Sequence, residues 1–417
     1  MFGLVGKLLP HTISPFIYNK LGDPHYQVWE TDDIETFIKA KNYSGLNVTI
    51  PYKEAVIPYL DELDGVAKTI KSVNTIIRRD GKLIGYNTDY YGLFKTIQYH
   101  KISIKNKKVL IIGNGGAAKT ARFLMSNLRA EKITLLCRNP KTQDEQPLSS
   151  IENYSDAQII INTTPVGMYP HNEDQLLFSL KPFHQLETVL DLIYNPLKTK
   201  LLIEAESLGI NAYNGLYMLV MQAKASRELF LDDSNIDHLI AKEIYNFLNK
   251  GRHNLVLIGL PLSGKSTYSK DLSYRFQKSL IDTDHTIEKQ EDLSIKDIFT
   301  QKGERYFRSL ESKIVSDSYQ KTNVVISTGG GMVMDSDIML KLKQNGIVIY
   351  LDRDYHIIMD KTINNRPLIQ SKADVEKLAL MRIPLYKKYA DIIVNVDRPK
   401  LEVIKEIEDK IYDYLSR

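Results

Sequence analysis

Two stretches of similar design decide the fold: KKVLIIGNGGAAKTARFLM (107–125) and HNLVLIGLPLSGKSTYSKDL (253–272). In each, a continuous apolar run leads into a glycine-rich turn and then into apolar residues with helical spacing. This order places backbone N–H groups and the N-terminus of a helix where a phosphate group can bind. Because the two stretches lie far apart in the chain, we expect each to nucleate its own α/β domain.

A chain of 417 residues is long enough for two to three domains of about 150 residues each. We predict an α/β class with three parts: an α/β domain over 1–95, completed by a helix at 216–245; a Rossmann-type domain over 96–215; and a P-loop domain with a parallel sheet over 252–417. The main boundary is expected near NFLNKGRHN (246–254), which loses apolar periodicity and contains Gly251.

The composition is that of a soluble globular protein, with 43% apolar and 25% charged residues. Lys plus Arg (55) exceed Asp plus Glu (51) by only 4, too little to indicate a nucleic acid or membrane partner. The single cysteine, Cys137, excludes an internal disulfide and a cysteine-cluster metal site, and suits a reducing compartment. No apolar run approaches the roughly 20 residues that cross a bilayer. We therefore predict a cytoplasmic protein; its oligomeric state stays open.

The first glycine turn, GNGGAA, is typical of dinucleotide sites but also of other tight strand–helix turns. At the end of the following strand, KITLLC (132–137), an NAD site would have a carboxylate, whereas this chain has Arg138. An arginine there favours the 2′-phosphate of NADP, assisted by Lys141, unless Arg138 is only a solvated charge. The strand in QIIINTTPVGM (158–168) would bring Thr163 to the same crevice. The residues predicted to bind the cofactor are thus Gly113, Gly115, Gly116, Arg138, Lys141 and Thr163.

The second glycine turn, GLPLSGKST (259–267), fits the phosphate-loop pattern G-x-x-x-x-G-K-[ST]. Backbone N–H groups of such a loop surround the phosphates of ATP, while Lys265 neutralises the β and γ oxygens and Ser266 ligates Mg²⁺. The alternative is a glycine turn that only caps a helix. The nucleotide-binding residues expected here are Gly259, Gly264, Lys265, Ser266 and Thr267.

A lysine and an aspartate suit the chemistry of carbonyl reduction. NVTIPYK places Lys53 after a strand stiffened by proline, and GYNTD places Asp89 at a turn. The ammonium can donate a proton as a hydride arrives, and the carboxylate can orient or exchange that proton. The alternative is a surface ion pair.

Six separated motifs in the first half carry a family resemblance. They are HTISP (11–15), GLNVTIPYKEAV (45–56), SVNTII (72–77), GYNTDYYG (85–92), LDLIYNP (190–196) and NGLYMLVMQA (214–223). In this order they resemble shikimate dehydrogenase over roughly residues 1–245, which makes 1–95 the substrate domain.

The resemblance implies catalytic roles for Lys53 and Asp89. It also implies that the substrate carboxylate is held by Thr12, Ser14, Thr49 and Tyr194. The ring hydroxyls would be held by Asn74 and Gln222. Gly215 and Met218 would line the nicotinamide, although Met218 could equally be a core residue. The chain departs from the family in having Thr12 for Ser, Tyr18 for His and Cys137-Arg138-Asn139 for Asn-Arg-Thr.

The second half resembles shikimate kinase over residues 252–417. The motifs are SLIDTDHTIE (279–288), SIKDIFTQKGERYFRSLE (294–311), VVISTGGG (324–331), NRPLI (365–369) and RIPLYKKYAD (382–391). Asp282 and Asp284 are two apart and are expected to face the same side of one strand end.

The resemblance implies that Asp284 accepts or positions the proton of the substrate hydroxyl and that Asp282 holds Mg²⁺ through water. Arg308 and Arg382, the latter at a helix start, would bind the substrate carboxylate, while Gly329, Gly330 and Gly331 approach the ring and Arg366 closes on a lid. Leu262 replaces a family glycine, and the segment between Arg366 and Arg382 is short.

Together, the resemblances imply a bifunctional enzyme of the route to chorismate and the aromatic amino acids. NADPH would reduce 3-dehydroshikimate to shikimate, and ATP with Mg²⁺ would phosphorylate shikimate to shikimate 3-phosphate. Rival interpretations are a quinate/shikimate dehydrogenase fused to a kinase for another hydroxy acid, and a regulatory module without turnover. A nucleic-acid-binding ATPase would need a basic tract that the chain lacks.

Overall fold

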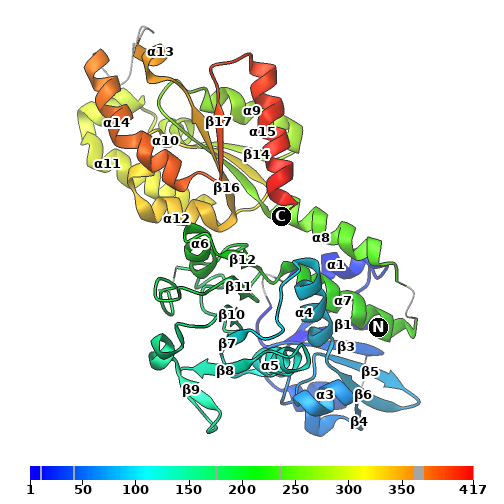
Figure 1. Ribbon diagram of the computed structural model, residues 1–417. Helices are drawn as coiled ribbons and strands as arrows, with labels where there is room; N and C mark the ends of the chain where they lie inside the picture. The colour runs from blue at the N-terminus through cyan, green and yellow to red at the C-terminus, as the bar shows by residue number, and fades with distance from the viewer. Residues whose placement is uncertain (10–11, 41–42, 174–175, 234–235, 360–370, 417) are drawn as a thin grey trace. The chain divides into compact units, whose positions relative to one another are not determined.

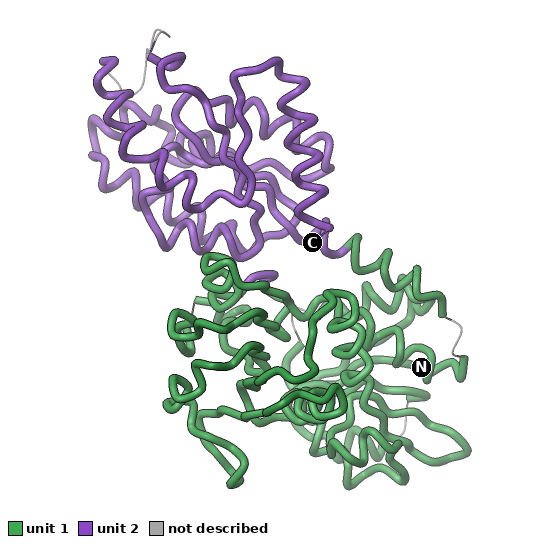
Figure 2. Tube along the Cα trace, in the orientation of Figure 1, with its two compact units in different colours: residues 1–195, 199–247 green, residues 196–198, 248–417 purple. Residues whose placement is uncertain are grey.

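The computed structural model describes residues 1–9, 12–40, 43–173, 176–233, 236–359 and 371–416. The chain divides into two compact units, Met1–Asn195 with Thr199–Phe247 and Pro196–Lys198 with Leu248–Arg417 (Figure 2). The division falls inside helix α8 (His238–Arg252). The stretch 246–254, which the sequence marks as a boundary, is therefore helical up to Arg252 rather than a loop.

The first sheet of unit 1 has the strand order β2-β1-β3-β5-β6-β4 (Figure 1). Strand β1 pairs in parallel with β2 and β3, whereas β5 pairs antiparallel with β3 and β6. The strands are β1 (Phe2–Gly6), β2 (Gln27–Glu30), β3 (Gly45–Val48), β4 (Glu62–Leu63), β5 (Thr75–Arg79) and β6 (Lys82–Tyr86). The accompanying helices are α1 (Ser14–Lys20), α2 (Ile34–Lys39), the 3₁₀ turn η1 (Ile57–Tyr59), α3 (Gly65–Ile70) and α4 (Thr88–Tyr99).

The second sheet of unit 1 grows from the stretch 107–125 and has the order β12-β11-β10-β7-β8-β9, paired in parallel. Its elements are β7 (Lys108–Ile112), α5 (Gly116–Asn127), β8 (Lys132–Cys137), β9 (Glu145–Pro147), η2 (Leu148–Tyr154), β10 (Ile159–Asn162), β11 (Thr188–Asp191), α6 (Lys200–Ser207) and β12 (Asn211–Tyr213). Alternate residues of β7 enter two different buried clusters, one on each face of the sheet. A sheet buried on both faces explains why its strands are continuously apolar.

The segment after β12 returns to the first sheet. Helix α7 (Leu216–Leu231) packs against α4, and it ends where Asp232 adopts a left-handed conformation with φ 54°. The single helix expected over 216–245 is therefore two helices, α7 and α8, because the polar stretch after Leu231 caps the first one.

Unit 2 contains a parallel sheet of order β14-β15-β13-β16-β17. Figure 1 labels β14, β16 and β17 of this sheet. Along the central strand, Leu255 and Leu257 enter one buried cluster while Val256 and Ile258 enter the other. The alternation shows that both faces of the sheet are buried, and it confirms the predicted α/β class with a parallel sheet in the P-loop domain.

The elements of unit 2 follow the phosphate-loop stretch in an alternating order. They are β13 (Asn254–Ile258), α9 (Lys265–Phe276), β14 (Ser279–Asp282), α10 (Thr283–Glu291), α11 (Ile295–Ser318), β15 (Val324–Ser327), η3 (Met332–Met334), α12 (Ser336–Asn345), β16 (Gly346–Asp352), α13 (Tyr355–Met359), α14 (Lys372–Tyr389), β17 (Ile392–Asn395) and α15 (Lys400–Leu415). Helix α11 is kinked at Gly303. Of the helices in the described part of the chain, none combines the length and apolar character needed to cross a membrane.

Candidate active sites

Lys53 and Asp89 meet in unit 1. Lys53 lies in the loop after β3, and its Nζ is 2.6 Å from Oδ2 of Asp89. Asp89 lies in the first turn of α4, which Asn87 caps by accepting a hydrogen bond from the backbone of Tyr90, rather than in an open turn as expected. The Asp89 side chain is only 9% exposed and that of Lys53 20% exposed, so this is not a solvated surface pair.

Two amide side chains complete this group. Asn74 Nδ2 donates to Oδ1 of Asp89 at 2.9 Å and to Oε1 of Gln222 at 3.4 Å. Gln222 comes from α7, so α4 and α7, two helices far apart in the sequence, both contribute to the site. The structure thus brings four of the predicted residues, Lys53, Asn74, Asp89 and Gln222, into one hydrogen-bonded cluster.

A buried polar network lies behind this cluster. Tyr18 and Tyr26 both donate to Oδ1 of Asn47, at 2.6 and 2.7 Å. Asn47 Nδ2 donates to the Ser226 hydroxyl at 2.9 Å, which lies 2.9 Å from the Thr88 hydroxyl. Burial raises the pKa of Tyr18 far above its usual range, so the phenol stays a neutral donor. The network holds Thr88, the residue before Asp89, in place.

The four residues expected to hold the substrate carboxylate are spread over several loops. Thr12 Oγ1 donates to Ser14 Oγ at 3.1 Å, at the start of α1. Thr49 follows β3, its N–H bonded to the carbonyl of Val5, and Tyr194 follows β11. Their shared role in binding the carboxylate stays a prediction.

The turn between β7 and α5 has the shape that a phosphate needs. Gly113 has φ 117°, and a Cβ there would lie 2.5 Å from Oγ1 of Thr163, which is held by the carbonyl of Ile112 at 2.7 Å. Gly115 caps α5 and would place a Cβ in open space. An open helix N-terminus behind a turn that requires glycine fits a dinucleotide pyrophosphate.

Gly215 and Met218 lie at the start of α7. A Cβ at Gly215 would overlap the carbonyl of Leu192, so this position requires glycine. Met218 is buried in the core cluster that covers β7, which agrees with the alternative that it is core. Its contact with the nicotinamide stays a prediction.

Arg138 and Lys141 follow β8, and the Arg138 side chain is exposed. The backbone N–H of Lys141 donates to Oε2 of Glu145 at 2.7 Å. Burial raises the pKa of the nearby Cys137 thiol, which keeps this cysteine from acting as a nucleophile. Glu145, which the sequence reasoning missed, therefore lies among the residues predicted to bind the 2′-phosphate.

The phosphate loop of unit 2 connects β13 to α9. Gly259 and Gly264 have φ values of 150° and 95°. Lys265 opens α9, and its Nζ donates to the carbonyls of Gly259 and Leu260 at 2.9 and 3.0 Å. Leu262 also has a positive φ, 65°, so the loop keeps the backbone that glycine would favour although its crown carries a side chain. At the start of α9 the backbone N–H of Thr267 donates to the carbonyl of Gly264.

Asp282 and Asp284 do not share a strand as expected. Asp282 ends β14 and caps α10, and Asp284 lies in the first turn of that helix. The strand ends early because the Asp282 side chain accepts the N–H of His285 and starts the helix. Asp282 Oδ2 also accepts a 2.8 Å hydrogen bond from Ser266 Oγ, which brings the two predicted Mg²⁺ ligands together.

A cavity of about 720 Å³ joins the remaining residues expected to bind the kinase substrate. Arg308 Nη1 lies 2.6 Å from Oε2 of Glu311, whose side chain is 1% exposed. Burial raises the pKa of Glu311 to about 7, against the opposing effect of the Arg308 charge. The lining includes Ser266, Asp282, Asp284, Arg308, Glu311, Gly329, Gly330, Gly331 and Arg382.

The three glycines after β15 make room for these charged groups. A Cβ at Gly331 would overlap the Arg308 guanidinium, and one at Gly329 would overlap Oε1 of Glu311. The Gly330 carbonyl accepts a 2.6 Å hydrogen bond from Tyr386. Larger residues here would fill the cavity.

Arg382 lies inside α14, not at a helix start, because the helix continues through Pro384 to Tyr389. The residue is 5% exposed, and burial lowers the pKa of its guanidinium, which is still charged at neutral pH. Arg366, expected on a lid, lies outside the described residues, as does the lid itself.

The match to known proteins covers both units. Residues 4–76 match the model of the shikimate dehydrogenase substrate binding domain, and residues 261–412 match that of shikimate kinase. A shikimate dehydrogenase (NADP(+)) of Clostridium perfringens is 35% identical over 267 residues, which cover 60% of this chain and 98% of that protein. The chain belongs to the shikimate dehydrogenase family. It is a fusion, because a shikimate kinase domain follows the dehydrogenase.

Solved structures of shikimate dehydrogenases share the fold of the first unit. Shikimate dehydrogenase 1 of Peptoclostridium difficile is 36% identical, with a TM-score of 0.55 over 59% of this chain and 97% of that chain. A chorismate mutase/shikimate 5-dehydrogenase fusion protein of Clostridium acetobutylicum is 34% identical, with a TM-score of 0.55 over 60% and 97%. These matches confirm the predicted resemblance.

Some functional candidates escaped the sequence reasoning. Glu311 stands three residues after Arg308 on one helix, a spacing that predicts an ion pair and could have been noticed. Asn47 and Ser226 join a network between distant segments, for which the sequence carries no local signal.

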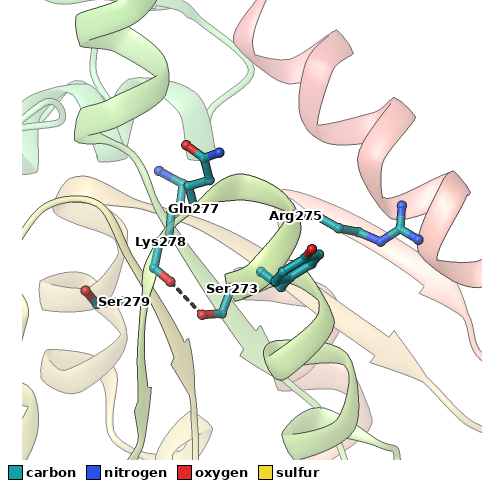
Figure 3. A pocket seen from close by; sticks show the side chains of 6 residues that line it. Ser273, Arg275, Gln277, Lys278 and Ser279 are labelled. Atoms are coloured by element: carbon teal, nitrogen blue, oxygen red, sulfur yellow. Dashed lines mark hydrogen bonds between the residues drawn. The ribbon is translucent and has the colours of Figure 1, made fainter.

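A second hollow in unit 2, of about 640 Å³, lies at the end of α9 (Figure 3). Three of its six lining side chains have partners within the protein. Ser273 donates to the Lys278 carbonyl at 2.6 Å, and Lys278 Nζ donates to the His253 carbonyl at 2.8 Å. Arg275 is paired with Glu408.

Proposed function

We propose that this shikimate dehydrogenase–kinase fusion catalyses two successive reactions of the shikimate pathway. The first is the NADPH-dependent reduction of 3-dehydroshikimate to shikimate, and the second is the phosphorylation of shikimate by ATP and Mg²⁺ to shikimate 3-phosphate. The observation that carries the proposal is the pairing on one chain of a dehydrogenase and a kinase whose family names share one compound. The product of the first site is the substrate of the second.

In the dehydrogenase site, Lys53 is the proton donor, and Asp89 holds the Lys53 side chain in position. The 2.6 Å contact orients the Lys53 ammonium, while Asn74 fixes the other oxygen of Asp89. NADPH supplies the hydride, and the glycine turn at the start of α5 fits its pyrophosphate. Asn74 and Gln222 each offer a donor and an acceptor to the ring hydroxyls of the substrate. Thr12, Ser14, Thr49 and Tyr194 are proposed to hold the carboxylate.

In the kinase site, Asp284 positions the attacking hydroxyl and takes its proton, while Lys265 binds the transferring phosphate. Arg308 and Arg382 lie in the same cavity and suit a carboxylate, which a guanidinium binds with two parallel hydrogen bonds.

The donors around the phosphate loop fit Mg²⁺. Ser266 and Asp282 supply two oxygen ligands within 2.8 Å of each other. In the described residues no group of three or more His, Cys, Asp or Glu side chains could enclose a metal. An ion held by few protein ligands matches Mg²⁺, which keeps several waters and the substrate phosphates, and which neutralises charge on the phosphates.

The binding partners and the cellular location of this enzyme are also proposals. We propose a cytoplasmic enzyme that binds small anionic acids and nucleotides, without a nucleic acid or membrane partner. The single cysteine, Cys137, and the small charge surplus of +4 support this.

Two lysine substitutions test the assignment. Lys53→Met should lower the rate of NADPH oxidation by about 10²-fold or more while ADP formation from added shikimate is unchanged, and Lys265→Met should do the reverse. The exposed Lys68 and Lys270 provide matched Met controls in the two units. Loss of both activities on either change, in a protein whose circular dichroism is normal, would contradict two independent sites. Turnover of quinate in place of shikimate would contradict the assignment of shikimate as the substrate.

A further inference from the structure

The connection between β8 and β9 brings a carboxylate to the end of the second sheet at which the glycine turn between β7 and α5 lies. Strand β8 ends at Cys137, and β9 begins at Glu145 after a short connection without a helix. The two strands pair in parallel, with Glu145 opposite Leu135. From this position the Glu145 side chain reaches the residues that follow β8, where it accepts the N–H of Lys141.

Three donors hold this carboxylate in place. They are the backbone N–H of Lys141 at 2.7 Å, Nδ2 of Asn114 at 3.0 Å and the Cys137 thiol at 3.5 Å. Asn114 belongs to the glycine turn, between Gly113 and Gly115, and therefore ties Glu145 directly to the cofactor loop. The hydrogen bond from Lys141, followed by that from Asn114, lowers the pKa of Glu145, so the group is an anion at neutral pH.

One oxygen of Glu145 remains as an acceptor. Among the described residues, the recorded hydrogen bonds to this carboxylate all go to Oε2. An acceptor at the end of the second strand is what binds the ribose 2′-hydroxyl in NAD sites, whereas an arginine there accommodates the 2′-phosphate of NADP. This chain has both kinds of group, the exposed Arg138 from β8 and Glu145 from β9.

We infer that Glu145 is a specificity-determining residue of the dehydrogenase site, whose charge opposes the cofactor's 2′-phosphate and offsets Arg138. The inference rests on the proposed function. Its consequence is weak discrimination: the protein binds NADP(H), but NAD(H) competes more closely than Arg138 alone would allow. The negative charge of Glu145, rather than its shape, is what opposes the 2′-phosphate. A neutral side chain of the same shape would keep the hydrogen bonds that hold the β8–β9 connection in place.

The variant Glu145→Gln separates the charge from the structural role. Its side-chain oxygen can still accept from Lys141 and Asn114, so the connection should keep its shape. Binding is followed by the nicotinamide fluorescence of NADPH and NADH, without 3-dehydroshikimate and with saturating ADP to occupy the kinase. The ratio of Kd(NADH) to Kd(NADPH) should rise about tenfold in Glu145→Gln. It should fall in Arg138→Gln and stay constant in the control Glu152→Gln, an exposed carboxylate on η2.

The outcomes separate the inference from the proposed function. An unchanged ratio in Glu145→Gln, or an equal change in both dissociation constants, means that Glu145 only holds the connection and overturns the inference alone. If the wild-type protein binds neither dinucleotide, the proposed dehydrogenase fails and the inference fails with it. Circular dichroism of the variant should match that of the wild type.

Discussion

The substitution Glu311→Gln should change how the stability of the kinase unit depends on pH. Glu311 is almost fully buried, and its pKa is raised from 4.5 to about 7, mainly by burial and in part by Asp284, while Arg308 and Arg382 act in the opposite direction. A raised carboxyl pKa means that the folded state binds the proton more tightly than the unfolded state does. Stability from this group is therefore complete below pH 4.5 and is lost as the pH rises to about 7.

The size of the effect follows from the shift. A rise of the pKa from 4.5 to about 7, at 1.36 kcal/mol per pKa unit, corresponds to about 3 kcal/mol. Between pH 4.5 and pH 8, wild-type unit 2 should thus lose about 3 kcal/mol more unfolding free energy than Glu311→Gln, which cannot titrate. Glu304 pairs with the same guanidinium at 3.0 Å but is 52% exposed, so Glu304→Gln should change the profile by at most about 1 kcal/mol.

Hydrogen-exchange mass spectrometry in urea can measure this, because peptides from unit 2 are read separately from those of unit 1. Rates are corrected for the intrinsic dependence of exchange on pH. Parallel pH profiles for wild type and Glu311→Gln would refute the reasoning, since they would mean that Glu311 has the same proton affinity in the folded and unfolded states. A similar change in Glu304→Gln would also refute it, because the effect would then not depend on burial.

Two further changes test the dehydrogenase unit, whose unfolding can be followed by the fluorescence of the lone tryptophan, Trp29. Gly215→Ala should destabilise this unit by about 2 kcal/mol or more and lower dehydrogenase activity, because a Cβ would overlap the Leu192 carbonyl; Gly65→Ala, which meets open space, is the control, and an equal effect of both would contradict the overlap. Tyr18→Phe and Tyr26→Phe should each cost about 1 kcal/mol, because the other phenol still donates to Asn47. The double variant should cost more than the sum, and simple additivity in a double-mutant cycle would contradict the shared acceptor.

The sequence predicted the parts of the fold that depend on local patterns. The apolar runs at 108–112 and 254–258 are strands, and each leads through its glycine turn into a helix. Lys53 and Asp89 could be paired in advance because a family resemblance supplied the long-range contact. The compact units change between Phe247 and Leu248, inside the stretch 246–254 in which the sequence places the boundary, although this stretch is helical up to Arg252.

One error arose where a side chain has two local roles, and the others arose where tertiary contacts decide the structure. Asp282 is both a strand end and a helix cap, and the cap moves Asp284 onto α10. Arg382 precedes Pro384 by two residues, a spacing that suggests a helix start, yet tertiary packing keeps α14 continuous. Glu145 could not be recognised, because its position depends on the pairing of β9 with β8 and on contacts with Asn114.

The two sites share one electrostatic arrangement, in which a buried carboxylate holds a cation in place. Lys53 is paired with Asp89 and Arg308 with Glu311, each at 2.6 Å. Such pairing explains how a chain with a surplus of only +4 can serve several anions, because each cation is oriented and partly neutralised locally. At Arg308, binding of the substrate carboxylate would exchange one carboxylate partner for another. Protonation of Glu311 near pH 7 should therefore leave Arg308 freer to bind the shikimate carboxylate, so the KM of the kinase for shikimate should fall as the pH decreases through that value.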